Sequence, residues 1–196
     1  MGNTLAVYSG DATANITWEE QHLYGSSRLG YWNAGVVNGG SATTSWNTPG
    51  KTLYELSNHL GNVMAMISGN EAILREADVR QMQDYYPFGM VMPGRSFSAG
   101  GGSYRYGFNG QEKSDEINGE GSNYNALFWQ YDARLGRRWN IDPKPVTGLS
   151  LYATFTNNPI LFEDSNGDTT SLNLFSKSDK PSLNWYGNNA VKKTKE

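Results

Sequence analysis

A six-residue pattern that occurs twice decides the fold class. Gly-Asn-Thr-Leu-Ala-Val at residues 2–7 returns as Gly-Asn-Val-Met-Ala-Met at residues 61–66. Each copy starts with a turn dipeptide and continues as a run that suits a β-strand, so each unit completes its core only against its neighbour. The repeat therefore predicts a sheet that is assembled from successive, similar units.

The rest of the chain alternates between short strand-like runs and turn signals. Runs rich in Tyr, Trp, Thr and Val are interrupted by Gly, Pro or Asn-Gly roughly every ten residues, which is typical of successive antiparallel hairpins. Residues 35–50 and 98–103 are rich in Gly and Ser and predict loops. Residues 71–83 fit either a helix or a strand. The dipeptide Asn-Gly, a strong turn signal, occurs at residues 38–39, 109–110, 118–119 and 166–167.

Composition and charge exclude several classes of protein. The 196 residues include 7 Phe, 6 Trp and 12 Tyr, but no Cys and only 2 His. The chain therefore has no disulfide framework, thiolate metal site or Cys nucleophile, and it supplies a Ser-His-Asp triad poorly. We expect no cofactor. The longest apolar run, residues 63–67, is far shorter than the ~20 residues that cross a bilayer, and no signal peptide is present.

The acidic and basic residues are distributed unevenly. Residues 1–171 carry 11 Lys and Arg against 17 Asp and Glu, a net charge of −6. Nucleic-acid binding needs clustered basic residues, so this acidic body argues against a nucleic-acid partner. The last 25 residues, 172–196, carry five Lys against two acidic residues. We interpret these lysines as a solvated tail.

Six motifs in a fixed order carry a resemblance to a known family. Over residues 1–170 the chain resembles the RHS/YD-repeat proteins, and in particular the RHS repeat-associated core domain that ends the shell of polymorphic toxins. The motifs stand at residues 84–90 (Asp-Tyr-Tyr-Pro-Phe-Gly-Met), 106–113 (Tyr-Gly-Phe-Asn-Gly-Gln-Glu-Lys), 131–139 (Tyr-Asp-Ala-Arg-Leu-Gly-Arg-Arg-Trp), 142–143 (Asp-Pro), 151–159 and 164–168.

The resemblance implies a mostly β fold built from antiparallel hairpin units in a curled, partly open sheet. We expect three parts: RHS/YD-repeat-like units in residues 1–103, a core or plug region in residues 104–168, and a short irregular tail in residues 169–196. In this family a much longer chain winds into a hollow shell around a toxin. The 196 residues are therefore expected to be the end of such a shell, and the tail the stump of a variable C-terminal domain.

The same resemblance implies where the protein acts and with what. It predicts a bacterial protein that is secreted or displayed at the cell surface as part of a larger chain. Its expected partners are a longer RHS-repeat chain or a C-terminal toxin. The open edges of the sheet also predict self-association, because an unpaired edge strand can pair with another chain.

A self-cleavage site is a further implication of the resemblance. In the family, two aspartates in the patterns Asp-Pro-x-Gly and Asp-Pro-x-Gly-Leu cleave the chain after the last residue of the second pattern. The matching residues here are Asp142 and Asp164, which stand 22 positions apart, so the cleaved bond would follow Asp168. Three departures from the patterns are Pro145 for Gly, Ser165 for Pro and Asp168 for Leu.

Peptide hydrolysis by a pair of aspartates requires a particular geometry. Two carboxylates hydrolyse a peptide bond when they lie close enough for one to act as acid and the other as base. Asp142 and Asp164 meet if the chain between them folds back, for example with residues 149–155 as a strand followed by a turn. Asp168, as a third carboxylate, would compete for the shared proton. Alternatively, each aspartate only caps a turn.

Two other hypotheses concern the surroundings of these aspartates. Arg134, Arg137 and Arg138 lie near Asp132 and Asp142 in the sequence, and we interpret them as structural ion-pair partners. Alternating oxygen ligands at residues 164, 166 and 168 suggest a calcium loop. However, that loop needs Gly at its sixth position and Glu at its twelfth, where Thr and Phe stand.

Two alternatives to a self-cleaving shell end remain. The chain would be an inert structural remnant of the same fold, or a glycan-binding or adhesive module at a cell surface. For the glycan alternative, the candidate residues are Trp18, Trp32 and Trp46, which are flanked by loops rich in Gly and Ser. The exposure of these rings discriminates between a shell and a glycan-binding module. The aromatic residues of a shell face inward, whereas those of a lectin cluster on the outer surface.

Overall fold

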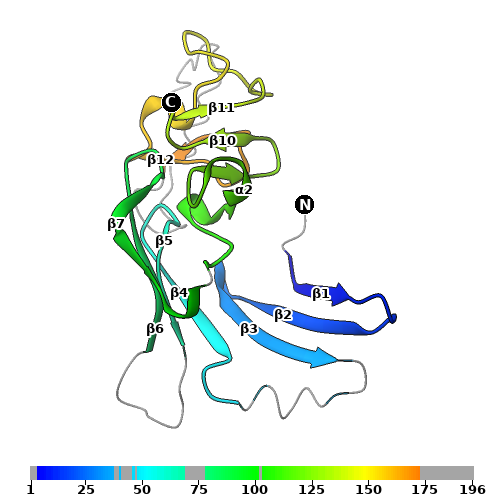
Figure 1. Ribbon diagram of the computed structural model, residues 1–196. Helices are drawn as coiled ribbons and strands as arrows, with labels where there is room; N and C mark the ends of the chain where they lie inside the picture. The colour runs from blue at the N-terminus through cyan, green and yellow to red at the C-terminus, as the bar shows by residue number, and fades with distance from the viewer. Residues whose placement is uncertain are drawn as a thin grey trace, which may run out of the picture. The chain divides into compact units, whose positions relative to one another are not determined.

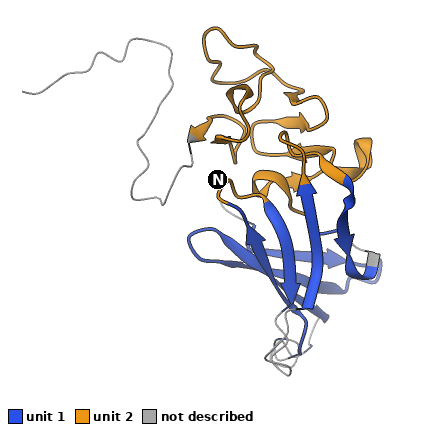
Figure 2. Cartoon of the chain, turned by 90° about the vertical axis from the view of Figure 1, so that its left-hand side faces the viewer, with its two compact units in different colours: residues 1–58, 63–84, 93–104 blue, residues 59–62, 85–92, 105–196 orange. Residues whose placement is uncertain are grey.

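In a computed structural model, the chain forms two compact units. The structure describes residues 4–37, 40, 46, 48–68, 78–101 and 103–172. Unit 1 comprises residues 1–58, 63–84 and 93–104, and unit 2 comprises residues 59–62, 85–92 and 105–196 (Figure 2). The chain passes between the units several times, so neither is one continuous stretch of sequence.

One antiparallel sheet of seven strands, in sequential order, dominates the first half of the chain (Figure 1). Sequential order is what successive hairpins produce, and the expected antiparallel, mostly β architecture is confirmed. Within the described ranges the sheet is open, since β1 and β7 are its two edges. The strands are β1 Ala6–Gly10, β2 Ile16–Tyr24, β3 Arg28–Val37, β4 Thr52–Ser57, β5 Val63–Ser68, β6 Asp78–Tyr85 and β7 Val91–Ser98.

The repeat places β5 as expected. β5 starts directly after Gly61 and Asn62, and Gly61 has a φ of 76°. The last two residues of the first copy, Ala6 and Val7, begin β1, but its first two residues lie outside the described part of the chain. Of the stretch that fitted either helix or strand, residues 78–83 belong to β6, and residues 71–77 also lie outside the described ranges.

Gly30 allows β3 and β4 to pair closely. Its φ is 147°, and a Cβ atom at this position would lie 1.9 Å from the carbonyl oxygen of Leu53. Along β3, Gly30, Trp32 and Ala34 alternate with more exposed residues and form the buried face. Period-2 alternation of this kind buries one face of a sheet.

A buried acidic residue connects distant segments of unit 1. The carboxylate of Glu55, on β4, accepts hydrogen bonds from the Arg28 side chain on β3 and from the Tyr104 hydroxyl. The side chains of Arg28 and Glu55 are 13% and 3% exposed. Because a buried charge is tolerated only when it is paired, this network stabilises one arrangement of the three segments.

Unit 2 is built from short strands and turns. Its four-stranded sheet has the order β11-β10-β9-β8, and a separate two-stranded sheet pairs β12 with β13. No helix in the described ranges is long and apolar enough to span a membrane, and α2 has only four residues. The elements are η1 Ala99–Gly101, η2 Phe108–Gly110, β8 Glu112–Lys113, α2 Asp115–Asn118, β9 Asn123–Asn125, β10 Gln130–Asp132, β11 Arg137–Arg138, η3 Phe155–Asn157, β12 Phe162–Glu163 and β13 Ser171–Leu172, of which η1 belongs to unit 1.

Aromatic rings form the core of unit 2. Phe155 is 1% exposed and lies at the centre, with its ring centroid 5.2 Å from that of Trp129, 5.6 Å from Tyr131 and 5.7 Å from Phe108. All three pairs are edge-to-face, an arrangement that aromatic quadrupoles favour. The side chains of Tyr124 and Ala133 complete the buried cluster.

The structure contradicts the expected strand over residues 149–155. Only Ala153 forms a β-bridge, with Arg137, and the chain then makes a left-handed turn. Phe155, Thr156 and Asn157 have φ values of 50°, 53° and 59°. Each such residue costs about 1–2 kcal/mol, so the surroundings must hold the turn in place. Burial of Phe155 does so, together with a 2.9 Å hydrogen bond from the preceding Thr154 hydroxyl to the Gly136 carbonyl.

The tail also differs from its expected irregular form at its start. Ser171 and Leu172 form β13, which pairs with β12 through Glu163 and Phe162. The residues from 173 onward, including the five lysines, lie outside the described part of the chain. The two-residue strand arises because residues 164–170 turn tightly enough to return the chain beside β12.

The central position of Phe155 yields a stability prediction. Replacing it with Ala (Phe155→Ala) removes the ring that contacts three other aromatic side chains, and we expect a loss of about 3–5 kcal/mol in the free energy of unfolding. Urea unfolding followed by tryptophan fluorescence measures this. The matched control is Leu135→Ala, at a side chain that is 70% exposed, with an expected change below about 0.5 kcal/mol. Equal losses in the two variants would contradict the assignment of Phe155 to the core.

Candidate functional site

The loop of the β12–β13 hairpin contains the candidate cleavage point. Asp164 follows β12 directly, and its Oδ1 atom accepts hydrogen bonds from the backbone N–H groups of Gly167 at 2.7 Å, Asp168 at 3.1 Å and Thr169 at 3.4 Å. Asp164 therefore caps the turn, as one of the two alternatives predicted. The capping also places its carboxylate against the amide nitrogen of the bond between Asp168 and Thr169.

Gly167 sets the path of this loop over the core. It has a φ of 82°, and a Cβ atom here would lie 2.6 Å from the Trp129 ring. Only glycine combines that backbone conformation with so close an approach. The Asn-Gly turn signal at residues 166–167 is confirmed, but the sequence does not reveal the ring beneath it.

Two residues that were not predicted as part of the site, Gln111 and Trp129, support the loop of residues 164–170. Gln111 donates a 2.7 Å hydrogen bond from Nε2 to the Asp164 carbonyl, and its Oε1 accepts one from the Trp129 indole at 3.3 Å. Gln111 is 3% exposed. In the sequence, the signal for Gln111 is a polar residue directly after the Asn-Gly turn at 109–110. Its partner Asp164 lies 53 positions away, so the sequence does not reveal the contact.

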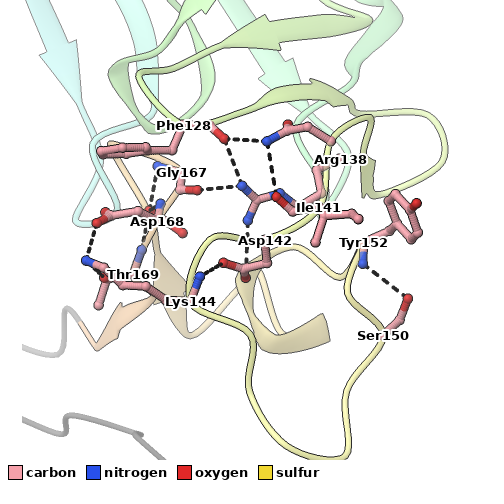
Figure 3. A network of polar contacts seen from close by, with 12 residues as sticks. Phe128, Arg138, Ile141, Asp142, Lys144, Ser150, Tyr152, Gly167, Asp168 and Thr169 are labelled. Carbon is pink, nitrogen blue, oxygen red and sulfur yellow. Dashed lines mark hydrogen bonds and ion pairs between the residues drawn. The ribbon is translucent and has the colours of Figure 1, made fainter.

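The guanidinium of Arg138 joins Asp142 to the same loop. Its Nη1 atom lies 3.1 Å from Oδ2 of Asp142, and its Nη2 atom donates 2.9 Å hydrogen bonds to the carbonyl oxygens of Phe128 and Gly167 (Figure 3). The other carboxylate oxygen of Asp142 accepts the backbone N–H of Lys144 at 2.8 Å. The predicted ion pair of Arg138 is confirmed, and it holds Asp142 beside the loop that Asp164 caps.

Asp142 and Asp164 line one small cavity. Its volume is about 20 Å³, which is room for one water molecule. Trp129, Phe155 and Thr156 also line it, so the aromatic core and the left-handed turn form part of its wall. The chain between the two aspartates does fold back, through the turns of residues 143–161 rather than through the expected strand.

Burial raises the pKa of Asp164 to about 6, although three backbone N–H groups act in the opposite direction. The negative charge of Asp168 raises it further, as expected of a third carboxylate. Below about pH 6, Asp164 is therefore mostly protonated, while its Oδ1 atom accepts the backbone N–H of Thr169. A carboxyl group whose pKa is raised by burial is a candidate general acid.

Lys144 neutralises Asp168. Its ammonium forms an ion pair with the Asp168 carboxylate and donates a 3.2 Å hydrogen bond to Oγ1 of Thr169 (Figure 3). The two contacted residues stand on either side of the candidate bond. Together with the three backbone donors on Asp164, this pairing leaves the carboxylates of Asp164 and Asp168 engaged by N–H groups. Nowhere in the described ranges do three His, Cys, Asp or Glu side chains gather in a way that fits a metal ion.

Of the other two arginines, Arg134 forms the predicted ion pair, whereas Arg137 differs from the prediction because it donates its hydrogen bonds to neutral oxygens. Arg134 forms an ion pair with Asp132 at 2.8 Å, and Arg137 donates a 3.1 Å hydrogen bond to Oδ1 of Asn157 in the left-handed turn. Burial disfavours the charged form of Asp132. However, hydrogen bonds from the Arg134 side chain and from the N–H groups of Arg134 and Leu135 hold its pKa below the ordinary value. Both contacts stabilise turns of unit 2.

The three tryptophans proposed for glycan binding have unlike surroundings. Trp32 is 3% exposed, Trp46 is 48% exposed and Trp18 is half-buried. Trp18 and Trp32 pack edge-to-face at 5.1 Å, and Trp32 and Trp46 pack in the same way at 5.0 Å. These rings therefore form a packed row with the buried Trp32 in the middle, rather than a flat outward platform.

Two comparisons of the sequence with known proteins give no match. No protein-family model matches the chain, and no curated protein matches its sequence.

The raised pKa of Asp164 predicts how stability depends on pH. Because the folded chain binds this proton more tightly than the unfolded chain, its contribution is complete below about pH 4 and is lost as the pH rises through about 6. The loss corresponds to about 3 kcal/mol in the free energy of unfolding. Urea unfolding of the native chain and of the Asp164→Asn variant between about pH 4 and pH 7.5 measures it. Parallel pH profiles in the two proteins would show that Asp164 does not titrate as described.

Proposed function

We propose that this chain is the end of an RHS-type shell that cuts itself after Asp168, with Asp142 and Asp164 as the reacting carboxyl groups. The single observation that carries the proposal is the cavity of about 20 Å³ that both aspartates line. It lies beside a loop whose candidate bond already directs its N–H toward Asp164. The reaction is intramolecular, so the bond is presented at a high effective concentration without a substrate pocket.

The chemistry assigns opposite roles to the two carboxyl groups. Asp142, as the carboxylate, takes a proton from a water molecule in the cavity, and the resulting hydroxide adds to the carbonyl carbon of Asp168. Asp164, in its protonated form, gives its proton to the amide nitrogen of Thr169, and the C–N bond breaks. The products are a free carboxyl group on Asp168 and a free amine on Thr169. One water has been added across the bond, and the proton has moved from Asp164 to Asp142.

Arg138 acts in this proposal as a positioning residue. One of its nitrogens holds Asp142, and the other holds the carbonyl oxygen of Gly167, which is one residue before the bond that breaks. The guanidinium is charged at any relevant pH and its donors have a fixed fork geometry, so it keeps the base and the loop in register. Its contact with the Trp129 ring, at 5.3 Å from the centroid, adds a further constraint.

The wider role rests on the resemblance described above. The open, antiparallel sheet supports it at the level of fold class. In this role, residues 1–168 are the last units of a secreted or surface-displayed bacterial shell. The cut after Asp168 separates the shell from an effector that follows it. The partners are then a longer RHS-repeat chain or a C-terminal toxin.

An inert shell end is the competing interpretation, and one experiment separates the two. We expect the native chain, incubated at about pH 5.5, to yield a product that ends at Asp168 and a second product that starts at Thr169. Asp142→Asn and Asp164→Asn should each abolish both products, because one removes the base and the other the acid. Intact-mass spectrometry over time measures the cleaved fraction, and circular dichroism verifies that each variant is folded.

A matched control uses a carboxylate outside the site. Asp78→Asn changes a half-exposed residue of unit 1, where Asp78 pairs with Arg80, and it should cleave like the native chain. Above about pH 6 the native rate should fall by about tenfold per pH unit, because only protonated Asp164 can donate. An uncut native chain across this pH range would favour the inert shell end.

A further inference from the structure

Asp168, the residue before the candidate bond, is charged and forms an ion pair with Lys144. The side chain of Asp168 is 15% exposed and that of Lys144 is 44% exposed, so the pair lies at the edge of unit 2 with the acid as its more buried member. A carboxylate with so little contact with water requires a nearby positive charge. Lys144 supplies this charge from 24 positions earlier in the chain.

Lys144 also contacts the residue after the bond and one of the two aspartates. Its ammonium reaches the Thr169 hydroxyl at 3.2 Å, while its backbone N–H donates to Oδ1 of Asp142 at 2.8 Å. A single residue thus touches both sides of the bond and the proposed base (Figure 3). Because the Asp142 contact is made by the backbone, a side-chain substitution of Lys144 leaves that hydrogen bond in place.

We propose that Lys144 is the specificity-determining and positioning residue of the site: it holds Asp168 and Thr169 so that the peptide bond between them stays against Asp164 and Asp142. This inference rests on the self-cleavage proposed above for its consequence in rate, but the positioning itself is a separate property of the loop. It explains how an aspartate is accommodated at a position where the resembling pattern has leucine. The acidic side chain is bound by a cation rather than by an apolar contact.

The first test is a double-mutant comparison of cleavage rates, measured by intact mass at about pH 5.5. Lys144→Met should slow cleavage by about tenfold to a hundredfold, because small misplacements of a reacting bond have effects of that size. Lys144→Arg should restore most of the rate. In an Asp168→Leu background, Lys144→Met should slow cleavage much less, by under about fivefold, because the charge that Lys144 binds is gone and only its contact with the Thr169 hydroxyl is lost. Arg95→Met, which removes the charge of a largely exposed arginine, is the control.

A second measurement does not depend on cleavage. In an Asp142→Asn background, which the proposed chemistry makes uncleavable, hydrogen exchange at the amides of Asp168 and Thr169 reports how firmly the loop is held. Lys144→Met should raise these exchange rates by at least about tenfold, while Lys144→Arg should leave them nearly unchanged. High salt should weaken the effect, since a half-exposed ion pair is screened.

The two measurements separate the failure of each proposal. Unchanged exchange rates in Lys144→Met would overturn the positioning role, whatever the cleavage assay gives. An uncut native chain together with accelerated exchange in Lys144→Met would overturn self-cleavage and support the positioning role. Equal slowing by Lys144→Met in the native and Asp168→Leu backgrounds would show that Lys144 acts without recognising Asp168, which also overturns the inference.

Discussion

The buried guanidinium of Arg138 is the constraint on which the candidate site depends. Its side chain is 1% exposed, so its charge and its donors must be satisfied by the protein. Its two Nη atoms meet most of this requirement by binding Asp142 and the carbonyl oxygens of Phe128 and Gly167, and the guanidinium lies over the face of Trp129. Its buried Nε atom has no hydrogen-bond partner among the residues that the structure describes. These groups come from separate turns of unit 2. One desolvated cation thereby connects those turns and holds Asp142 beside the loop that Asp164 caps.

The aromatic core explains why such short elements form a defined unit. The strands of unit 2 contain two or three residues each, which is too few for backbone pairing alone to stabilise them. Phe155 and the rings around it supply the missing burial. The same ring requires three consecutive left-handed residues, so the core holds a strained turn in the wall of the cavity. Strain of this kind persists only where packing over-determines the backbone, and here the packing and the candidate site share the same side chains.

The loop of residues 164–170 combines capping, burial and charge pairing in one short segment. The carboxyl group of Asp164 organises the turn by accepting backbone N–H groups, and burial by the surrounding rings raises its pKa. The structural and the chemical interpretations of this residue are therefore compatible: a carboxyl group that caps the turn is also the group nearest to a peptide nitrogen. Lys144 pairs with Asp168 and Arg138 pairs with Asp142, so two of the three carboxyl groups of this region each have a cationic partner.

The sequence by itself determined the local features of this protein. The open antiparallel order of the strands follows from closely spaced turn signals, and the Asn-Gly turn at residues 166–167 and the start of β5 after Gly61 follow from local conformational preference. Only the tertiary structure decided that Asp142 and Asp164 share a cavity, that Gln111 and Trp129 support the loop, and that residues 149–155 form no strand. The physical reason is the distance along the chain over which each interaction acts. A turn depends on the φ and ψ preferences of a few neighbouring residues, whereas desolvation, ring packing and ion pairing depend on segments that are brought together only when the whole unit has folded.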